Sequence, residues 1–537
     1  MKHTLQKISF HLFLCCLVLA CAPKKKEINY PTTDLAQNSL IPKPLEVIAT
    51  NSAFGLDSKT AIFTNQTTEG FEDVGMYLAE KIKQRLHLDI PVNSTLDETV
   101  ERIIYINQTD SLDSEAPEAY QLYIKNDSIL LNATTAAGAF RGIQTLRQLI
   151  PEESNDTVAE QPMWLIPSGK IVDAPLFEYR GAMLDVARHF FTVEEVKKFI
   201  DLLAYYKYNK FHMHLTDDQG WRIEIKSWPK LTEIGAQSEV GGGPGGFYTQ
   251  EEFKELVQYA AERHMEIIPE VDMPGHTNAA SFSYPVLNGN GKKLSYYTGT
   301  HVGFSTFDAR KDTVYAFLDD VIREIAAISP SPYFHIGGDE SHATKKTDYI
   351  HFVEKVEAIV RKHDKVMVGW EEIVQGKLDS GSIIQFWQDS VNAKTAALKG
   401  HQIIFSPAHK AYLDMQYDTL SKHGLHWAAY IPVDTAYNWD PSSYIKSLPK
   451  DHILGFEAPL WSETISNSAE LEYLAFPRAI GYSELGWTPA ESRDWEGYKA
   501  RLADQTAFLK RMNVAYYPSK LIDWKEPKNV YKEIKKD

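Results

Sequence analysis

The segment Tyr333-Phe334-His335-Ile336-Gly337-Gly338-Asp339-Glu340 shows the pattern that organises most of this chain. A short apolar run, typical of a buried strand, leads into two glycines that permit close backbone approach or unusual backbone angles. Two adjacent carboxylates follow where the strand ends. In an α/β barrel the reactive side chains lie at the C-terminal ends of the strands. The segment therefore predicts a barrel strand that ends at a candidate active site.

Similar short apolar runs alternate with helical stretches from about residue 171 to residue 515. Two of the intervening helices begin with a capping box, Thr192 with Glu195 and Thr249 with Glu252. The eight predicted strands are Gly181–Val186, Lys210–Leu215, Glu266–Val271, Tyr333–Ile336, Val366–Gly369, Ser382–Phe386, Gln402–Ser406 and Ile453–Glu457. Eight β–α units of this kind predict an α/β fold, the (β/α)8 TIM barrel, with loop insertions.

Polar or aromatic residues follow every predicted strand. In chain order they are Asp185 and Arg188, Asp217 and Asp218, Asp272 and His276, Asp339 and Glu340, Trp370, Trp387, Tyr412, and finally Trp461 with Glu463. Because the strand ends of a barrel meet at one face, these side chains are expected to surround one pocket. A ring of acids and indoles suits a sugar, since an aromatic face covers the apolar C–H face of a pyranose.

A smaller domain is expected before the barrel. Helical apolar spacing predicts helices over Phe71–Leu88 and Ala136–Ile150, and alternation predicts strands over Arg102–Ile106, Tyr120–Ile124 and Ser128–Asn132. This mixture predicts a small α/β (α+β) domain. The expected boundaries are 41–172 for this domain, 173–520 for the catalytic barrel and 521–537 for a C-terminal tail.

The beginning of the chain is predicted to be a targeting segment. Residues 1–20 have a basic start and an apolar run, Ile8 to Leu19, that is short for a membrane span. The run ends at Val18-Leu19-Ala20-Cys21, which resembles a bacterial lipobox and implies lipidation of Cys21. A plain signal peptide with an incidental cysteine is the alternative. Residues 21–40 are then expected to be a polar tether.

Cysteine content and charge narrow the environment and the partners. All three cysteines lie at positions 15, 16 and 21, so no internal disulfide is expected in the mature chain. The net charge of −16, with acids and bases interspersed, argues against nucleic acid and anionic membrane surfaces as partners. The expectation is an exported lipoprotein whose only membrane contact is the lipid on Cys21, at the periplasmic face or the cell surface.

The acid pair Asp339-Glu340 constrains the chemistry. Adjacent carboxylates repel, so one tends to have a raised pKa, which suits a general acid near neutral pH. The alternative is an N-cap Asp with a first-turn Glu. Ordinary glycosidases place two carboxyl groups on opposite sides of the anomeric carbon, roughly 5–9 Å apart, and sequence neighbours are poorly placed for that. If Glu340 is the acid, a substrate acetamide could attack, with Asp339 orienting its N–H group.

Long motifs carry a resemblance over nearly the whole mature chain. They are LDVARHF at 184–190, HMHLTDDQGWR at 212–222, PEVDMPGH at 269–276, GGDE at 337–340, WEE at 370–372 and, in the small domain, GIQTLRQL at 142–149. With these segments the sequence resembles the family 20 glycoside hydrolases, the β-N-acetylhexosaminidases. The resemblance implies release of terminal N-acetylglucosamine, or N-acetylgalactosamine, from the non-reducing ends of glycans, without a cofactor or a metal.

The resemblance also implies catalytic roles. Glu340 is implied as the general acid and then the general base, Asp339 as the residue that holds the acetamido N–H, and Tyr412 as the donor to the acetamido oxygen. That oxygen would attack the anomeric carbon and give an oxazoline-type intermediate with net retention, an exception to the two-carboxylate scheme. Tyr417 is close in sequence and is the alternative to Tyr412.

For the hydroxyl groups of the sugar, the resemblance implies Arg188 with Asp217, and Asp414 with Glu463 toward the far edge of the ring. Such fixed donors and acceptors suit hydrogen bonding to hydroxyl groups.

For the walls of the site, it implies Trp370, Trp387 and Trp461 around the acetamido group and the sugar face. His276, with Asp272 behind it, is implied to lie near Glu340 and tune its proton.

Three other readings of the residues stay open. His212, His214 and His276, with their neighbouring aspartates, could belong to a metal-dependent hydrolase such as a deacetylase, although hydrogen-bonded core histidines explain them more simply. The chain could be a glycan-binding lipoprotein without activity, or an endo-acting chitinase with an open cleft.

The stretch Gly241–Gly246 matches a dinucleotide-binding motif on paper. No strand leads into it, which favours a loop.

Overall fold

The computed structural model describes residues 32–65, 69–93, 100–112, 114–151 and 163–525. The predicted signal peptide, Cys21 and most of the expected tether and C-terminal tail lie outside the described residues. Where the expected tether is described, it packs on the first domain: Leu35 and Leu40 are buried, and Leu35–Gln37 forms a short 3-10 helix. Because the apolar side chains of Leu35 and Leu40 are buried, the polar tether ends before residue 40.

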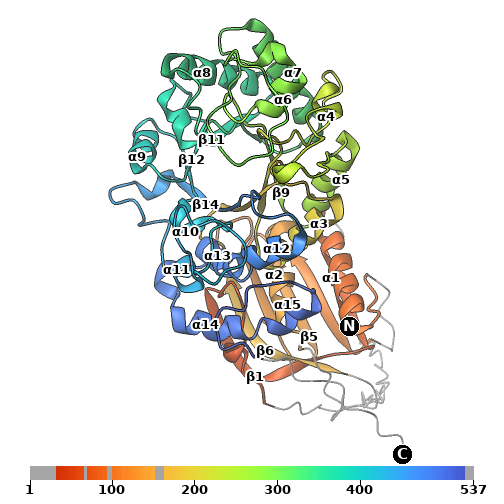
Figure 1. The fold of residues 1–537 in the computed structure, drawn as a ribbon. Helices are drawn as coiled ribbons and strands as arrows, with labels where there is room; N and C mark the ends of the chain where they lie inside the picture. The colour runs from red at the N-terminus through yellow and green to blue at the C-terminus, as the bar shows by residue number, and fades with distance from the viewer. Residues whose placement is uncertain (1–31, 66–68, 94–99, 113, 152–162, 526–537) are drawn as a thin grey trace, which may run out of the picture.

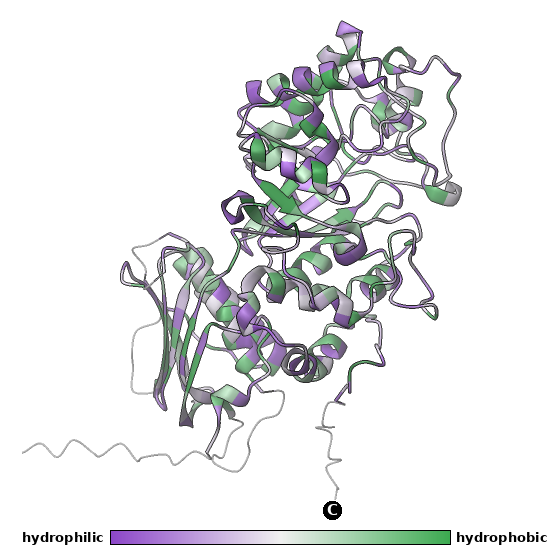
Figure 2. Ribbon diagram, turned by 90° about the vertical axis from the view of Figure 1, so that its left-hand side faces the viewer, coloured by the Kyte–Doolittle hydropathy of each residue, from purple (hydrophilic) through white to green (hydrophobic). Residues whose placement is uncertain are grey.

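The first domain is a six-stranded mixed sheet with two helices packed on it (Figures 1 and 2). The strand order is β1-β6-β4-β5-β3-β2, with parallel pairing in β2-β3-β5 and antiparallel pairing elsewhere. The elements are β1 (Glu46–Leu56), β2 (Thr60–Thr64), α1 (Phe71–Leu86), β3 (Arg102–Gln108), β4 (Tyr120–Ile124), β5 (Ser128–Ala133), α2 (Ala136–Leu149) and β6 (Trp164–Asp173). The three predicted strands and both helices are found.

The second domain contains a closed barrel of eight parallel strands, which confirms the predicted fold (Figure 1). The strands are β7 (Tyr179–Asp185), β8 (Lys210–His214), β9 (Glu266–Glu270), β10 (Tyr333–His335), β11 (Val366–Trp370), β12 (Ile383–Phe386), β13 (Ile403–Phe405) and β14 (Ile453–Leu460). Pairing of β14 with β7 closes the barrel. Each predicted strand corresponds to one of these.

Helices surround the barrel and extend beyond it. The longer ones are α3 (Val193–Tyr205), α5 (Gln250–Ala261), α7 (Asp312–Ile328), α8 (Lys346–Lys362), α9 (Ser390–Leu398), α12 (Ser468–Ala475), α13 (Arg478–Trp487) and α14 (Trp495–Ala503). The shorter helices are α4 (Lys230–Glu233), α6 (Asn278–Ser283), α10 (Ala408–Ala411), α11 (Val433–Tyr437) and α15 (Thr506–Arg511). Both predicted capping boxes are present, at the starts of α3 and α5. No helix in the described ranges has the length and apolar character needed to cross a membrane.

Buried charges connect the two domains. The Glu118 carboxylate, from the first domain, accepts hydrogen bonds from Arg141 in α2 and from Arg180 and Asn209 of the barrel, at 2.7, 2.6 and 3.0 Å. Burial alone would raise the pKa of Glu118, but the two guanidinium groups lower it to about 2. Nearby, the ammonium of Lys207 lies 2.9 Å from a carboxylate oxygen of Asp173. The sheet domain is therefore fixed to the barrel by ion pairs removed from water.

Candidate active site

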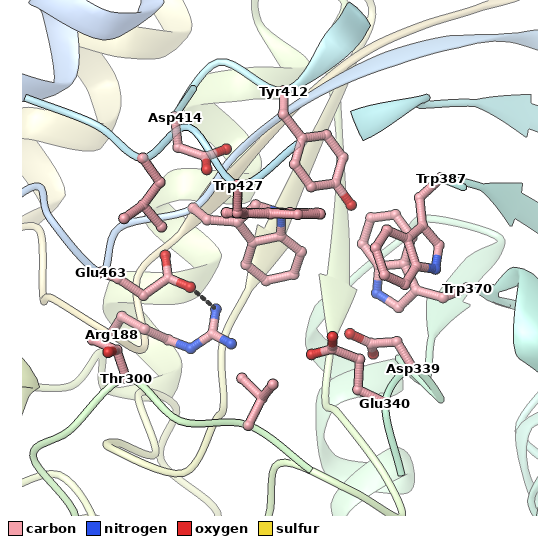
Figure 3. Close-up of a pocket in the computed structure, with 13 residues that line it drawn as sticks. Arg188, Thr300, Asp339, Glu340, Trp370, Trp387, Tyr412, Asp414, Trp427 and Glu463 are labelled. Carbon is pink, nitrogen blue, oxygen red and sulfur yellow. Dashed lines mark ion pairs between the residues drawn. The ribbon is translucent and has the colours of Figure 1, made fainter. Parts of the chain in front are cut away.

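One pocket gathers most of the residues that follow the barrel strands (Figure 3). Its free volume is about 230 Å³. The lining residues are Arg188, Thr300, Val302, Asp339, Glu340, Trp370, Trp387, Tyr412, Asp414, Leu425, Trp427, Trp461 and Glu463. Nine of the eleven residues predicted for catalysis and substrate binding are in this set, and the exceptions, Asp217 and His276, lie directly behind it.

The acid pair reaches the pocket through a turn that requires glycine. After β10, Gly337 and Gly338 have φ angles of +65° and +98°, and a Cβ on Gly337 would lie 1.9 Å from an Asp272 carboxylate oxygen. The next two residues, Asp339 and Glu340, project into the cavity on the same side (Figure 3). Glu340 itself has a φ of +44°, a conformation that non-glycine residues adopt rarely and often at functional sites.

The two carboxylates have different surroundings. Asp339 is buried, and its Oδ1 has no hydrogen-bond partner among the described residues. The Glu340 side chain is 30% exposed. Burial and the negative charge of Asp339 raise the pKa of Glu340, while His276 opposes the shift. Glu340 therefore has the character of a general acid, and Asp339 has an oxygen available for a ligand.

His276 lies below the acid pair. Its Nε2 is 3.8 Å from carboxylate oxygens of both Asp339 and Glu340, and its Nδ1 is 3.3 Å from an oxygen of Asp217. As the sequence interpretation placed it, Asp272 lies beside the imidazole, with a carboxylate oxygen within 4.8 Å of a His276 ring nitrogen. Asp272 also accepts a hydrogen bond from the Gly338 backbone N–H at 3.1 Å and so supports the turn that carries the acid pair.

Asp217 was expected to bind sugar hydroxyls directly, and the structure places it elsewhere. Its side chain is fully buried beneath Arg188, whose Nη2 lies 2.8 Å from it. It also accepts from His214 at 2.9 Å and faces His276. With these partners Asp217 orients Arg188 and His276, and only the guanidinium of Arg188 reaches the cavity.

Two further carboxylates of the pocket have buried oxygens with no hydrogen-bond partner among the described residues. Both oxygens of Asp414 and Oε2 of Glu463 are buried and have no hydrogen-bond partner in the described part of the chain. Burial and the neighbouring Glu463 raise the pKa of Asp414 well above its usual range. Arg188 lies 3.9 Å from Glu463, as the dashed line in Figure 3 marks. Buried acceptors of this kind need a partner, and the cavity is where a ligand could supply it.

Aromatic rings form the remaining walls. Trp370 and Trp461 have ring centroids 5.8 Å apart, and Tyr412 lies 6.3 Å from Trp461. Tyr412 follows α10 and lines the pocket, whereas the Tyr417 hydroxyl donates to the Leu474 carbonyl away from it. The structure thus favours Tyr412 over its sequence neighbour.

Sequence reasoning missed four lining residues. Thr300, Val302, Leu425 and Trp427 lie on long loops rather than at strand ends. Trp427 is 56% exposed and packs edge-on against Trp387. Its exposure is a property of the fold, so the sequence carried no signal that marked this tryptophan.

The histidines that suggested a metal are engaged with carboxylates. His212 lies between Glu457 and Glu270, at 2.9 and 3.0 Å, and His214 lies between Glu270 and Asp217, at 2.6 and 2.9 Å. Several groups among these residues bring their possible ligand atoms within 4.8 Å of one another. The carboxylates raise the pKa of His212 to about 9 against the effect of burial, which favours a hydrogen-bonded cationic imidazole.

Comparisons with known proteins find matches over most of the chain. The model of the glycosyl hydrolase family 20 catalytic domain matches residues 177–490, and that of the family's domain 2 matches residues 37–174. A β-N-acetylhexosaminidase from Cellulomonas fimi is 35% identical over 493 residues, covering 91% of this chain and 98% of that protein.

Solved structures are similar over the same extent. The family 20 β-N-acetylhexosaminidase of Streptomyces coelicolor A3(2) has a TM-score of 0.86 and 42% identity, covering 91% of this chain and 99% of that one. A variant of the Streptomyces plicatus β-hexosaminidase, solved with the product N-acetylglucosamine, has the same score and identity, covering 93% and 100%.

Proposed function

The chain belongs to glycoside hydrolase family 20 and is a β-N-acetylhexosaminidase, and we propose that its pocket takes one terminal sugar whose own acetamido group attacks the anomeric carbon. The observation that carries this proposal is the position of Asp339 and Glu340. They enter the cavity from one turn and on one side, so they do not face each other across a sugar ring. Because Asp414 and Glu463 are assigned to the sugar hydroxyls, the attacking group in this proposal comes from the substrate.

The first step uses all three proposed catalytic residues. Glu340 donates its proton to the glycosidic oxygen as the bond to the anomeric carbon breaks. The acetamido carbonyl oxygen forms a bond to that carbon from the opposite face. Asp339, through its unpartnered Oδ1, accepts from the acetamido N–H and stabilises the positive charge that develops on the five-membered ring. The Tyr412 hydroxyl donates to the acetamido oxygen and orients it.

The second step returns the enzyme to its starting state. Glu340, now ionised, removes a proton from water, and the water oxygen attacks the anomeric carbon. The bond to the acetamido oxygen breaks, and the sugar leaves with its original anomeric configuration. His276, at 3.8 Å from both carboxylates, is a cation that steadies the pair while the charge on Glu340 changes.

The other polar groups of the pocket hold the sugar ring. Asp414 and Glu463 present unpartnered acceptors, and Arg188 presents donors, which suits a set of hydroxyl groups. Trp370, Trp387 and Trp461 cover apolar faces of the ring and of the acetamido methyl.

The size of the cavity supports exo action. Its free volume of about 230 Å³ is below the roughly 300–1,000 Å³ typical of pockets for drug-sized ligands. One sugar unit suits this space, and the rest of the glycan would extend outward past Trp427. The substrate is then a glycan with a terminal N-acetylhexosamine, as the product in the Streptomyces plicatus structure also suggests.

For its location, we propose an exported lipoprotein. The support is the basic start and apolar run of residues 1–20 and the lipobox-like sequence before Cys21. Metabolic labelling with a palmitate analogue, comparing wild type with Cys21→Ala, tests it: label on the variant would contradict the assignment.

The catalytic proposal is tested with an aryl N-acetyl-β-glucosaminide, the plain aryl β-glucoside, and a chelator. We expect cleavage of the first substrate only, no effect of the chelator, and losses of about 10²-fold or more in both Glu340→Gln and Asp339→Asn. Cleavage of the plain glucoside would overturn acetamide participation. Loss of activity with the chelator would instead favour a metal-dependent hydrolase that uses His212, His214 and His276. An inactive wild type would favour a glycan-binding protein.

A further inference from the structure

Two adjacent glutamates outside the pocket lining hold one of its walls. Glu371 and Glu372 begin the 3-10 helix Glu371–Gln375 directly after β11, and Trp387 follows the next strand, β12. Trp387 is buried and forms part of the pocket wall. The proposed mechanism gives this wall to the acetamido group, so the inference below rests on the proposed function.

Glu371 fixes the backbone at this indole. One carboxylate oxygen accepts from the Trp387 N–H at 2.7 Å, and the other accepts from the Asp389 N–H. The Gln388 N–H lies 3.2 and 3.3 Å from the two oxygens. Three consecutive backbone donors thus converge on one buried carboxylate, which holds the turn that starts at Trp387.

Glu372 fixes the side chain of the same residue. Its Oε2 accepts from the Trp387 indole N–H at 3.2 Å. A ring held at its backbone and at its indole nitrogen has little freedom to tilt. Trp427 packs edge-on against the same ring at a centroid distance of 6.2 Å, but it is half exposed and supplies no hydrogen bond to it.

We propose that Glu371 and Glu372 are positioning residues that clamp Trp387, and that the clamp through Glu372 sets the size of the N-acyl group the pocket accepts. A fixed indole leaves room for a methyl group and excludes an additional methylene. A freed indole can tilt and admit it. Glu372, which does not touch the substrate, then determines the specificity for the acetyl group through its hydrogen bond to Trp387.

The electrostatics of Glu372 are consistent with this role. Burial, and then the negative charges of Asp339 and Glu371, raise the pKa of Glu372 to about 8. A neutral carboxyl group still accepts from the indole through its carbonyl oxygen, and it adds no second negative charge beside Asp339. Glutamine is therefore a close replacement for the form that predominates at neutral pH.

The test compares aryl glycosides that differ only in the acyl group, N-acetyl and N-propionyl, for the full-length wild type, Glu372→Ala, Glu372→Gln and Trp387→Phe. In a rigid pocket one methylene changes kcat/KM about 10- to 200-fold. We expect Glu372→Ala to raise the N-propionyl to N-acetyl ratio of kcat/KM by about fivefold or more. Trp387→Phe, which lacks the indole N–H, should raise it similarly, and Glu372→Gln should stay near wild type.

Glu357→Gln is the matched control. This buried glutamate accepts from Asp379 and Ser382 at the opposite end of β12, so the variant should keep the wild-type ratio even if it melts at a lower temperature. A wild-type ratio in folded Glu372→Ala would overturn the clamp, as would an equal rise in Glu357→Gln. If Glu372→Ala does not fold, a wild-type ratio in Trp387→Phe would overturn it. A wild type that does not require the acyl group would instead overturn the proposed function.

Discussion

At the scale of single residues, the site separates two neighbouring carboxylates by their surroundings. Asp339 is buried with an unpartnered oxygen, and Glu340 is partly exposed with a raised pKa. The strained turn that carries them fixes both on one side of the cavity, which is why the proposed nucleophile comes from the substrate. Asp217 shows the complementary arrangement, because its oxygens are all used to orient Arg188 and His276.

The raised pKa of Glu340 predicts a pH dependence. The carboxyl group must be protonated to act as an acid, so kcat/KM should fall as pH rises through its pKa, which lies above 4.5. Glu340→Gln should lose this limb and about 10²- to 10⁴-fold in kcat/KM on a disaccharide. On an aryl glycoside whose phenol is a good leaving group the loss should lie at the lower end of this range, about 10²-fold. Equal losses on both substrates, with the pH limb retained, would contradict the assignment.

At the scale of elements, the barrel was predictable because its signal is repeated. Each of the eight strands is a short apolar run with an acid or an aromatic residue after it, and the strands were found where expected. In the small domain β1, β2 and β6 were not predicted. β1 contains the polar stretch Thr50–Ser52 and an irregular register at that point, and β6 contains Pro167 and Gly169, which weaken a strand pattern.

Strand ends also predicted most of the site, and loops did not. Trp427 and Val302 reach the pocket from long connections whose path depends on tertiary contacts. The pattern likewise could not separate a residue that touches a ligand from one behind it, as Asp217 shows. Burial of one carboxylate by its neighbours is a property of packing and leaves no mark in sequence spacing.

The loop after α6 is held to the barrel by two residues that follow β8. Asp218 accepts from the Asn278 N–H at 2.9 Å and from the Ser305 hydroxyl, and Gln219 donates to the Gly299 carbonyl at 2.8 Å. The same loop carries Thr300 into the pocket. Asp218, the residue next to Asp217 in the sequence, is therefore the first of the residues that anchor this loop.

Removing that anchor should loosen the pocket. We expect Asp218→Ala to lower the free energy of unfolding by about 1–3 kcal/mol, because buried donors lose their acceptor, and to lower kcat/KM roughly 10- to 100-fold through misplacement. Limited proteolysis should cut within residues 284–306 sooner than in the wild type. Asp308→Ala, which removes a carboxylate that is 29% exposed just beyond this segment, is the control, and matching behaviour of the two variants would refute the anchor.

At the scale of the whole molecule, the sheet domain and the barrel behave as one unit because charged groups are buried between them. The single carboxylate of Glu118 pairs with two guanidinium groups, and its oxygens lie 2.7 Å from a nitrogen of Arg141 and 2.6 Å from a nitrogen of Arg180. Both guanidinium groups are almost fully buried. Arg180 lies in β7, the first strand of the catalytic barrel. The interface therefore holds a barrel strand directly.

Glu118→Gln should test how strongly this interface stabilises the fold. Removing one partner of a buried ion pair leaves its counter-charges uncompensated, and we expect a loss of about 3–5 kcal/mol in the free energy of unfolding at pH 7. The folded-state pKa of Glu118 is lowered to about 2. Its contribution is therefore present above the unfolded pKa of about 4.3 and is lost as pH falls toward 2.

Urea unfolding at pH 7 and pH 3 measures this contribution. The difference in the free energy of unfolding between wild type and Glu118→Gln should shrink at the lower pH. Glu251→Gln, which removes an exposed pair with Lys254, should leave the free energy of unfolding nearly unchanged at either pH. A difference that is constant with pH would mean that Glu118 acts through packing rather than through its charge.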